Sequence, residues 1–364
     1  MGQTFRLTAP REKLSIHWGR KLGEVLFGAS PDVLVRLLAV PVRPRNPSIA
    51  GCKRYHRRAE SKISDDRAVI NKSITFSGLP TEVHLLIFAN IESMQDVVCL
   101  GLTSRYFWSL GRDRMYAIYT SFLGRWANKN IVCVGEYVQP DDYPPELFSS
   151  KELATLRRMR TNLHDRPGVP FTLQHFTLPQ VSKMEEEDRV ARTYKDVVQN
   201  LAMMGIFKDN DPAFAATSSE IQVNEATFFP EDQPWILRNL TTKEFVRAES
   251  IALKPEFIHG PNIDALGFGH VVLSRICWSS DPSVSMSDTT NISRGIWAGH
   301  CFDITTLEKH HAETEGTEWS DVSEEIATEI AGVWETEFGT DWRQSICNHW
   351  YWHGTTCQLG AEPF

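Results

Sequence analysis

Residues 74–112 read ITFSGLPTEVHLLIFANIESMQDVVCLGLTSRYFWSLGR, the stretch that decides the fold expected for this chain. Pro80 suits a first helical turn, because the amide hydrogen that proline lacks would have no partner there. Ser93, followed three residues later by Asp96, indicates the start of a second helix. Thr103 can cap a third helix. The stretch therefore predicts three short helices in close order.

Apolar side chains repeat at helical spacing in all three segments. A unit of about forty residues cannot enclose so many large side chains, so some of them need an outside partner. The alternative is that these helices simply pack on the rest of the chain. The side chains concerned are those of Leu79, Val83, Leu86, Ile87, Val97, Val98, Leu100, Leu102, Tyr106, Phe107 and Trp108.

The same stretch resembles an F-box. Members of that family share Leu-Pro-x-Glu, an aliphatic pair, a break, an acidic residue that opens a second helix, an aliphatic run and a basic-aromatic ending. The matching positions are Leu79, Pro80, Glu82, Val83, Leu86, Ile87, Asp96, Val97, Val98, Leu100, Leu102, Ser104, Arg105 and Tyr106.

The resemblance implies a three-helix unit that binds the Skp adaptor, the subunit that joins F-box proteins to a cullin-type ubiquitin ligase. The residues that it assigns to this contact are Leu79, Pro80, Glu82, Val83, Leu86, Ile87, Val97, Val98, Leu100, Leu102 and Tyr106. Three further segments, the opening residues, 119–126 and 235–249, resemble more weakly the framework of a large F-box family of mushroom-forming fungi. That framework says nothing about the substrate.

The residues before this stretch predict two further parts. In 1–42, an N-terminal helical segment, Ser30 and Pro31 precede a helix with Leu34 and Leu38 on one face. Residues 43–73 are polar and basic, which indicates a flexible linker. The run KRYHRR within this linker is either a nuclear-import signal or an ordinary solvated segment.

Residues 113–126 predict a longer helix that supports the unit, which we bound at 74–127. From 128 to 364 strand and helix patterns mix, so the fold class is α+β: a small three-helix unit followed by a mixed α+β recognition domain. Strands are expected at 131–134, 235–240, 270–278 and 295–304, and helices at 149–163, 190–201, from Thr241 or Thr242 to Ala248, and at 321–338.

Charge and composition exclude several classes of protein. Residues 312–364 carry eleven Asp and Glu against Arg343 alone, a charge of −10 in a chain of net charge −8. Nucleic acid is therefore not an expected partner. No run of about 18 apolar residues occurs, and the chain lacks an apolar leader, so we expect a cytoplasmic or nuclear protein without membrane contact.

Candidates for chemistry are few. Cys347, His349, His353 and Cys357 have spacings that a zinc ion could use, although a strand or turn rich in aromatics explains the same segment. His300, Cys301 and Asp303 lie close together, but in a strand the first points away from the other two. The sequence contains no phosphate-binding loop and no nucleophile motif. We expect no catalytic residue, no cofactor and no metal.

The sequence therefore predicts a non-catalytic adaptor, with the Skp adaptor bound at one end and an unknown protein substrate at the other. Two alternatives stay open. One is an interaction protein that binds the Skp adaptor outside any ligase. The other is an enzyme with an unrecognised site in the carboxy-terminal half, for which a cleft with convergent titratable groups would be the sign.

Overall fold

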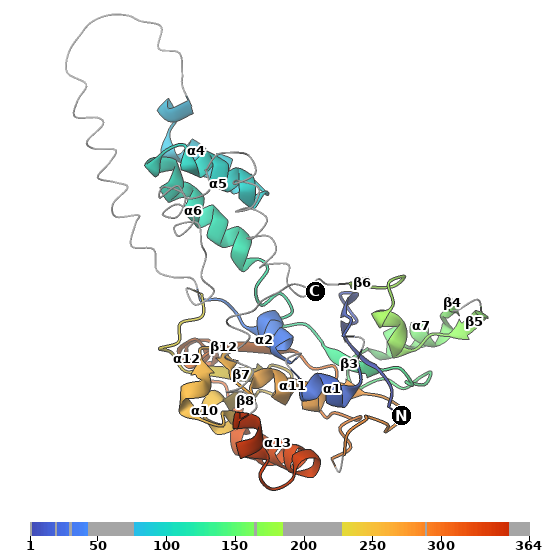
Figure 1. Cartoon of the computed structure of the whole chain (residues 1–364). Helices are drawn as coiled ribbons and strands as arrows, with labels where there is room; N and C mark the ends of the chain where they lie inside the picture. The colour runs from blue at the N-terminus through green and yellow to red at the C-terminus, as the bar shows by residue number, and fades with distance from the viewer. Residues whose placement is uncertain are drawn as a thin grey trace, which may run out of the picture. The chain divides into compact units, whose positions relative to one another are not determined.

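The chain forms two compact units, whose elements Figure 1 shows in order along the chain. The second unit comprises Val42–Leu123 and Asp188–Phe228, and the first comprises everything else. The computed structural model describes residues 2–18, 20–28, 31–42, 76–163, 166–184, 228–287 and 290–348.

The division corrects the expected domain boundaries. Met1–Pro41 packs together with Gly124–Glu187 and Phe229–Phe364, so the amino-terminal residues belong to the α+β unit and are not a separate helical segment. The α+β class itself is confirmed. The expected linker at 43–73 and the expected helix at 190–201 lie outside the described residues.

Within the described residues of the first unit, β1 (Phe5–Ala9) is the middle strand of a five-stranded sheet. It pairs antiparallel with β2 (Leu14–Ile16) and with β3 (Val132–Gly135). The parallel strands β11 (Cys277–Trp278) and β6 (Lys183–Met184) flank β3 and β2. The strand expected near 131–134 is confirmed, whereas the two amino-terminal strands were not expected.

β1 is buried along most of both faces. Phe5, Leu7 and Ala9 point to one face, yet Thr8 on the other face is also fully buried. Its hydroxyl donates to the Leu14 carbonyl at 2.8 Å, which satisfies the buried polar group. The run Phe-Arg-Leu-Thr-Ala alternates apolar and polar side chains, which is a strand signal that sequence analysis left unused.

A second sheet, four-stranded in the described part of the chain, has the order β12-β7-β8-β13. Its strands are β12 (Phe302–Thr306), β7 (Trp235–Asn239), β8 (Glu244–Arg247) and β13 (Ser320–Asp321). The strand expected at 235–240 is confirmed. The strand expected at 295–304 begins only at Phe302, and 296–299 form turns.

The helix expected after Thr241 is wrong, because β7 and β8 form a hairpin there. The Asn239 side-chain oxygen accepts from the backbone N–H groups of Thr241 at 3.1 Å and Thr242 at 3.4 Å. Lys243 closes the turn with a φ of 58°. The helical part is confined to α10 (Ala248–Ile251) beyond the second strand.

The strand expected at 270–278 is also wrong for most of its length, because α11 (Phe268–Ile276) occupies it and only β11 follows. All residues of α11 are buried, so no polar face reveals the helical period. α11 packs against α2 (Asp32–Leu38). Gly269 permits this approach, since a Cβ there would lie 1.9 Å from the Pro31 carbonyl oxygen.

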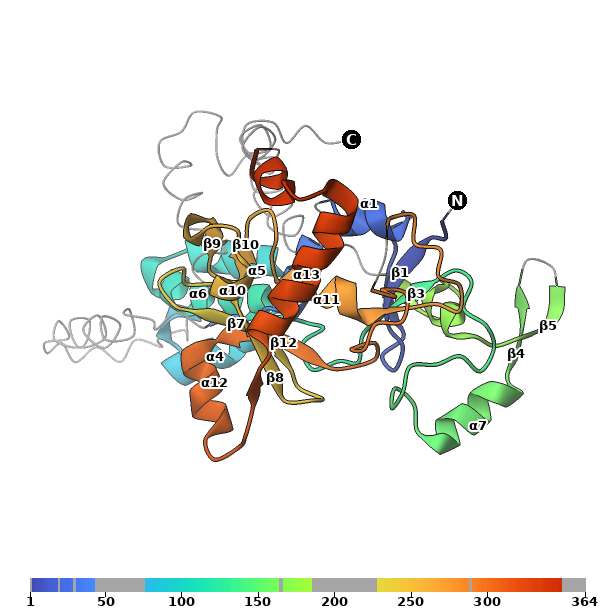
Figure 2. The same cartoon turned by 90° about the horizontal axis from the view of Figure 1, so that it is seen from below.

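Three further helices of this unit are α1 (Leu22–Leu26), α12 (Leu307–Thr314) and α13 (Ser323–Phe338). The helix expected at 321–338 is confirmed with a start two residues later, and it ends before Gly339, whose φ of 81° suits glycine. Figure 2 shows α13 beside α10 and α11. Smaller elements are η4 (Pro255–Phe257), β9 (Ile258–His259) and β10 (Asn262–Ile263).

The side of the five-stranded sheet that carries Val132 and Val134 packs against a layer from the middle of the chain. That layer contains α7 (Ser150–Arg158) and η2 (Leu173–Thr177), with the hairpin of β4 (Arg160–Leu163) and β5 (Arg166–Pro170) beside α7 (Figure 2). Ser149 and Glu152 form the expected capping box. The helix ends at Arg158, short of the expected 163.

The second unit contains η1 (Phe76–Gly78), α4 (Thr81–Ala89), α5 (Met94–Leu102) and α6 (Arg105–Thr120). The first two helices confirm the expectation. The third expected helix and the expected helix at 113–126 are one continuous helix, α6. None of the described helices in either unit is both long and apolar enough to cross a membrane.

Candidate functional site

Two of the three helices of the second unit, α5 and α6, start at serines whose side chains cap them. Ser93 Oγ accepts from the Asp96 N–H at 3.3 Å at the start of α5. Ser104 Oγ accepts from the Phe107 N–H at 3.1 Å at the start of α6. The expected cap, Thr103, instead ends α5 and donates to the Leu100 carbonyl. The break between the helices is therefore one residue later than expected.

The interior of this unit is small and tightly packed. Phe88 from α4, Val97 and Val98 from α5 and Phe107 from α6 are buried. Gly111 lets α4 press closely on α6, since a Cβ there would lie 2.9 Å from the Phe88 ring. These contacts use one side of α4 only.

The side of α4 that faces inward is unusual because it carries a histidine. His84 is buried, its Nε2 lies 2.8 Å from the Phe76 carbonyl oxygen and its Nδ1 lies 3.1 Å from the Tyr106 hydroxyl. The Phe76 ring packs on His84 and Phe107 at centroid distances of 5.1 and 5.0 Å. The ring of His84 therefore joins η1 and α6 to α4.

The other sides of α4 are apolar and open. The exposed fractions are 40% for Phe76, 36% for Val83, 46% for Leu85 and 64% for Leu86. Four of the nine large apolar residues that are exposed in the described chain thus fall between 76 and 86. Such a group of exposed apolar side chains is typical of a surface that a partner covers.

The structure sorts the predicted contact residues into three groups. Exposed side chains that a partner can reach directly belong to Pro80, Glu82, Val83 and Leu86. Half-buried ones belong to Leu79, Ile87, Leu100, Leu102 and Tyr106. Val97 and Val98 are fully buried, so in this arrangement of the helices they are core residues and do not present a contact surface.

Sequence analysis missed two residues of this surface and the buried histidine beneath it. Leu85 is exposed although it lies outside the expected stripe, Phe76 precedes the first helix, and His84 occupies an inward position. Residues four apart share a helix face, so placing Phe88 inward would have put His84 inward as well. The deciding signal is Phe88, which the expected stripe left out.

The far end of α6 carries a second aromatic contact within the same unit. The ring of Phe228 stacks on Tyr119 at a centroid distance of 5.5 Å and meets Tyr116 edge-on at 5.4 Å. The Phe228 carbonyl also accepts from the Val42 N–H at 2.8 Å. Residues more than a hundred positions apart thus complete the unit.

The candidates for chemistry do not assemble into a reactive site. Asp303 is held by Arg238 through two bonds of 2.6 and 2.7 Å, and His300 Nδ1 lies 3.0 Å from the Asn239 amide nitrogen. Burial raises the pKa of the Cys301 thiol and lowers that of His300. A protonated thiol beside engaged partners is a poor nucleophile.

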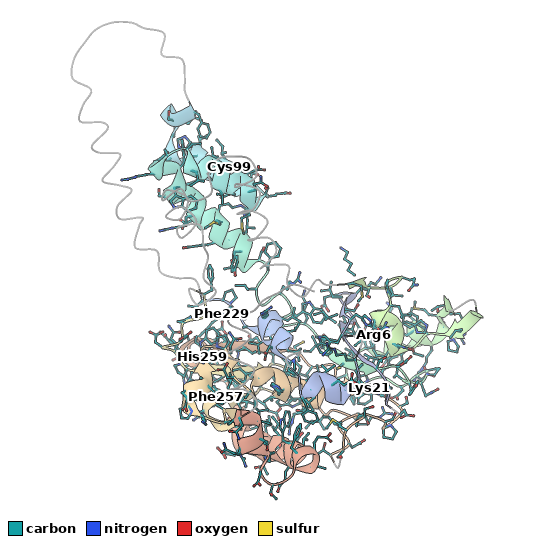
Figure 3. The ribbon with its side chains drawn as sticks, viewed as in Figure 1. Arg6, Lys21, Cys99, Phe229, Phe257 and His259 are labelled. Carbon is teal, nitrogen blue, oxygen red and sulfur yellow. The ribbon has the colours of Figure 1, made fainter. Side chains whose placement is uncertain are left out.

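The described ranges also contain no candidate metal site, because no group of three His, Cys, Asp or Glu side chains converges there. Cys347 is buried, and His349, His353 and Cys357 lie outside the described residues. Cys99 on α5 (Figure 3) is half-buried, and burial together with Asp96 raises the pKa of its thiol.

The chain matches no protein-family model, no curated protein and no solved structure.

Proposed function

We propose that this protein is a non-catalytic adaptor that binds a Skp adaptor through α4 and the residues around it, and so brings a protein substrate to a cullin-type ubiquitin ligase. The observation that carries the proposal is the open apolar surface of α4, made by Val83, Leu85 and Leu86. The resemblance of 74–112 to an F-box selects the Skp adaptor as the occupant. The first unit is then the part that meets a substrate.

The exposed side chain of Leu86 is a source of binding free energy. Covering a Leu side chain with a protein partner stabilises a complex by about 1.5–3 kcal/mol relative to leaving it in water. The open residues of α4 are therefore able to supply much of the free energy that a specific complex needs, with the half-buried residues around them excluding water.

The test is binding of the full-length chain to a purified fungal Skp adaptor, measured by calorimetry. We expect Leu86→Asp to weaken binding at least about thirtyfold, because a carboxylate would be buried without a partner in an apolar contact. Ile296→Asp is the matched control, since Ile296 is similarly exposed but belongs to the first unit. It should bind as the wild type does.

Circular dichroism of both variants separates binding from folding. Equal affinity of wild type and Leu86→Asp would contradict the proposal, as would absence of binding by a folded wild-type chain. Co-purification of the cullin then decides between a ligase adaptor and a protein that holds the Skp adaptor outside any ligase.

A further inference from the structure

The segment just before α4 carries an aromatic side chain into the surface described above. Phe76 is 40% exposed, yet its ring also rests on His84 and Phe107. Aromatic side chains that are partly buried before binding are strong anchors in interfaces, provided that they are already ordered. The contacts that hold Phe76 in place should therefore affect the affinity for a partner.

Two polar contacts fix the backbone of this residue in the described structure. The Phe76 carbonyl oxygen accepts from the Leu79 N–H at 3.2 Å, which closes the single turn of η1. It also lies 2.8 Å from His84 Nε2. Because a carbonyl oxygen can only accept, this nitrogen of His84 carries the proton. The first contact is local, and the second ties η1 to the body of α4.

His84 is held in place by its own surroundings. Its unprotonated Nδ1 lies 3.1 Å from the Tyr106 hydroxyl and can accept the single proton of that group, whose oxygen also lies 3.0 Å from Thr81 Oγ1. The ring of Phe107 packs edge-on against it at 4.9 Å. A buried polar ring with partners on both nitrogens has one orientation, so it can transmit that order to η1.

A buried apolar side chain at position 84 would need no hydrogen-bond partner from its neighbours. A histidine buried in a small helical unit has to be bonded, and here the bonds lead to the backbone of the segment that carries Phe76. The hydrogen bond of His84 Nε2 therefore fixes the position of η1 and adds nothing to the backbone hydrogen bonds of α4.

We propose that His84 is a positioning residue of the partner surface: it holds the segment Phe76–Leu79 on α4, so that the Phe76 ring enters the interface as an ordered anchor. The proposal rests on the function proposed above for α4. It adds a residue that makes no contact with the partner and acts through another.

The experiment compares His84→Leu, His84→Gln and Phe76→Ala in the full-length chain. Leu keeps the bulk of the side chain and removes both bonds, whereas the Gln amide nitrogen can still donate to the Phe76 carbonyl. Phe76→Ala removes the ring and leaves the backbone contact in place. We expect His84→Leu to weaken binding of the Skp adaptor about tenfold, and His84→Gln to restore most of that loss.

The double variant shows whether His84 acts through Phe76. In a Phe76→Ala background the His84→Leu substitution should cost little further affinity, because the anchor is already gone. Additive losses, or a Gln variant as weak as the Leu variant, would overturn the proposal. So would equal affinity of wild type and His84→Leu.

Hydrogen exchange of the chain without any partner keeps this test separate from that of the proposed function. His84→Leu should speed exchange of the amides of 77–79 about tenfold while those of α5 stay unchanged, and Gln should reverse this. If the wild type binds no Skp adaptor, the proposed function fails and the exchange result alone decides on His84. Unchanged exchange at 77–79, or faster exchange throughout α4 to α6, would contradict a positioning role.

Discussion

Leu86 and Phe88 lie two residues apart on α4 and have opposite environments. Leu86 is 64% exposed, whereas Phe88 is buried against α6. Both are large and apolar, so composition alone assigns them the same role. Their different burial predicts different consequences for stability and for binding.

We expect Phe88→Ala to lower the free energy of unfolding of this unit by about 3–5 kcal/mol, since it leaves a cavity beside Gly111. Leu86→Ala should change it by no more than about 0.5 kcal/mol. Urea denaturation followed by circular dichroism measures both. A large loss in the Leu86 variant would mean that this side chain belongs to the core.

Acid should destabilise the first unit through His270. Burial lowers the pKa of His270 to about 4, against 6.5 in the unfolded chain. The folded ring stays neutral while the unfolded ring takes up a proton below pH 6.5, so stability falls from about pH 6.5 down to about pH 4 and this group then has no further effect. The loss amounts to about 3 kcal/mol at most.

Thermal unfolding at several pH values between 7 and 4 measures this dependence. His270→Gln should show a shallower slope than the wild type over the same range, whatever its stability at pH 7. Burial also lowers the pKa of His175, which adds to the slope in both proteins. If the melting temperatures of the wild type and His270→Gln fall equally with pH, His270 does not cause the acid destabilisation.

At the scale of elements, α11 and α13 behave as one assembly. Arg275 of α11 is buried, and its guanidinium donates to Glu325 at 3.0 Å and to Glu329 of α13. It also lies 4.7 Å from the centre of the Trp297 ring. The acidic face of α13 is therefore partly engaged in holding a buried cation.

Charge reversal of Glu325 and Glu329 to Lys should therefore lower the stability of the first unit. We expect the double variant to lose about 2 kcal/mol of stability, less than a fully buried pair because Glu325 is exposed. Glu335→Lys is the matched control on the same helix, and its melting temperature should change little. Equal melting temperatures would show that Arg275 does not need these carboxylates.

The apolar side of α13 anchors it to the unit. Ile326, Ile330 and Trp334 are buried, whereas Phe338 at the end is 45% exposed. We expect Ile330→Ala to cost about 2–5 kcal/mol, as deletion of a buried aliphatic side chain does. Denaturant unfolding measures it, and a cost below about 1 kcal/mol would mean that the helix is loosely docked.

At the scale of the whole molecule, both units are built from segments that lie far apart in the sequence. Phe228 completes the helical unit, and Trp126, six residues beyond the end of α6, is fully buried in the other unit. A cut through the chain near 128 therefore damages both. A fragment whose ends are chosen from sequence patterns therefore omits part of each unit.

We expect the fragment 70–128 to bind the Skp adaptor more weakly and to melt at a lower temperature than the helical unit of the full chain. The reason is that it lacks Phe228 and exposes the Trp126 ring. Phe228→Ala in the full chain isolates the first effect, and hydrogen exchange of α6 measures it. Unchanged exchange at Tyr116 and Tyr119 would show that the stacking is dispensable.

The sequence by itself determined the features that short-range bonds produce. The starts of α4, α5 and α7 follow from Pro80, Ser93 and Ser149, and the end of α13 follows from Gly339. Each depends on contacts within about four residues, which a local pattern contains. The mixed fold class follows from the same patterns.

The tertiary structure decided what depends on distant partners. β1 is the middle strand of its sheet because β3 pairs with it from over a hundred residues away, and α11 is a helix although its uniformly buried residues show neither period. The roles of Val97 and Leu85 were likewise settled by which side of each helix meets α6. Local patterns specify how a segment begins and ends, but burial, which fixes each side chain's role, is a property of the packed chain.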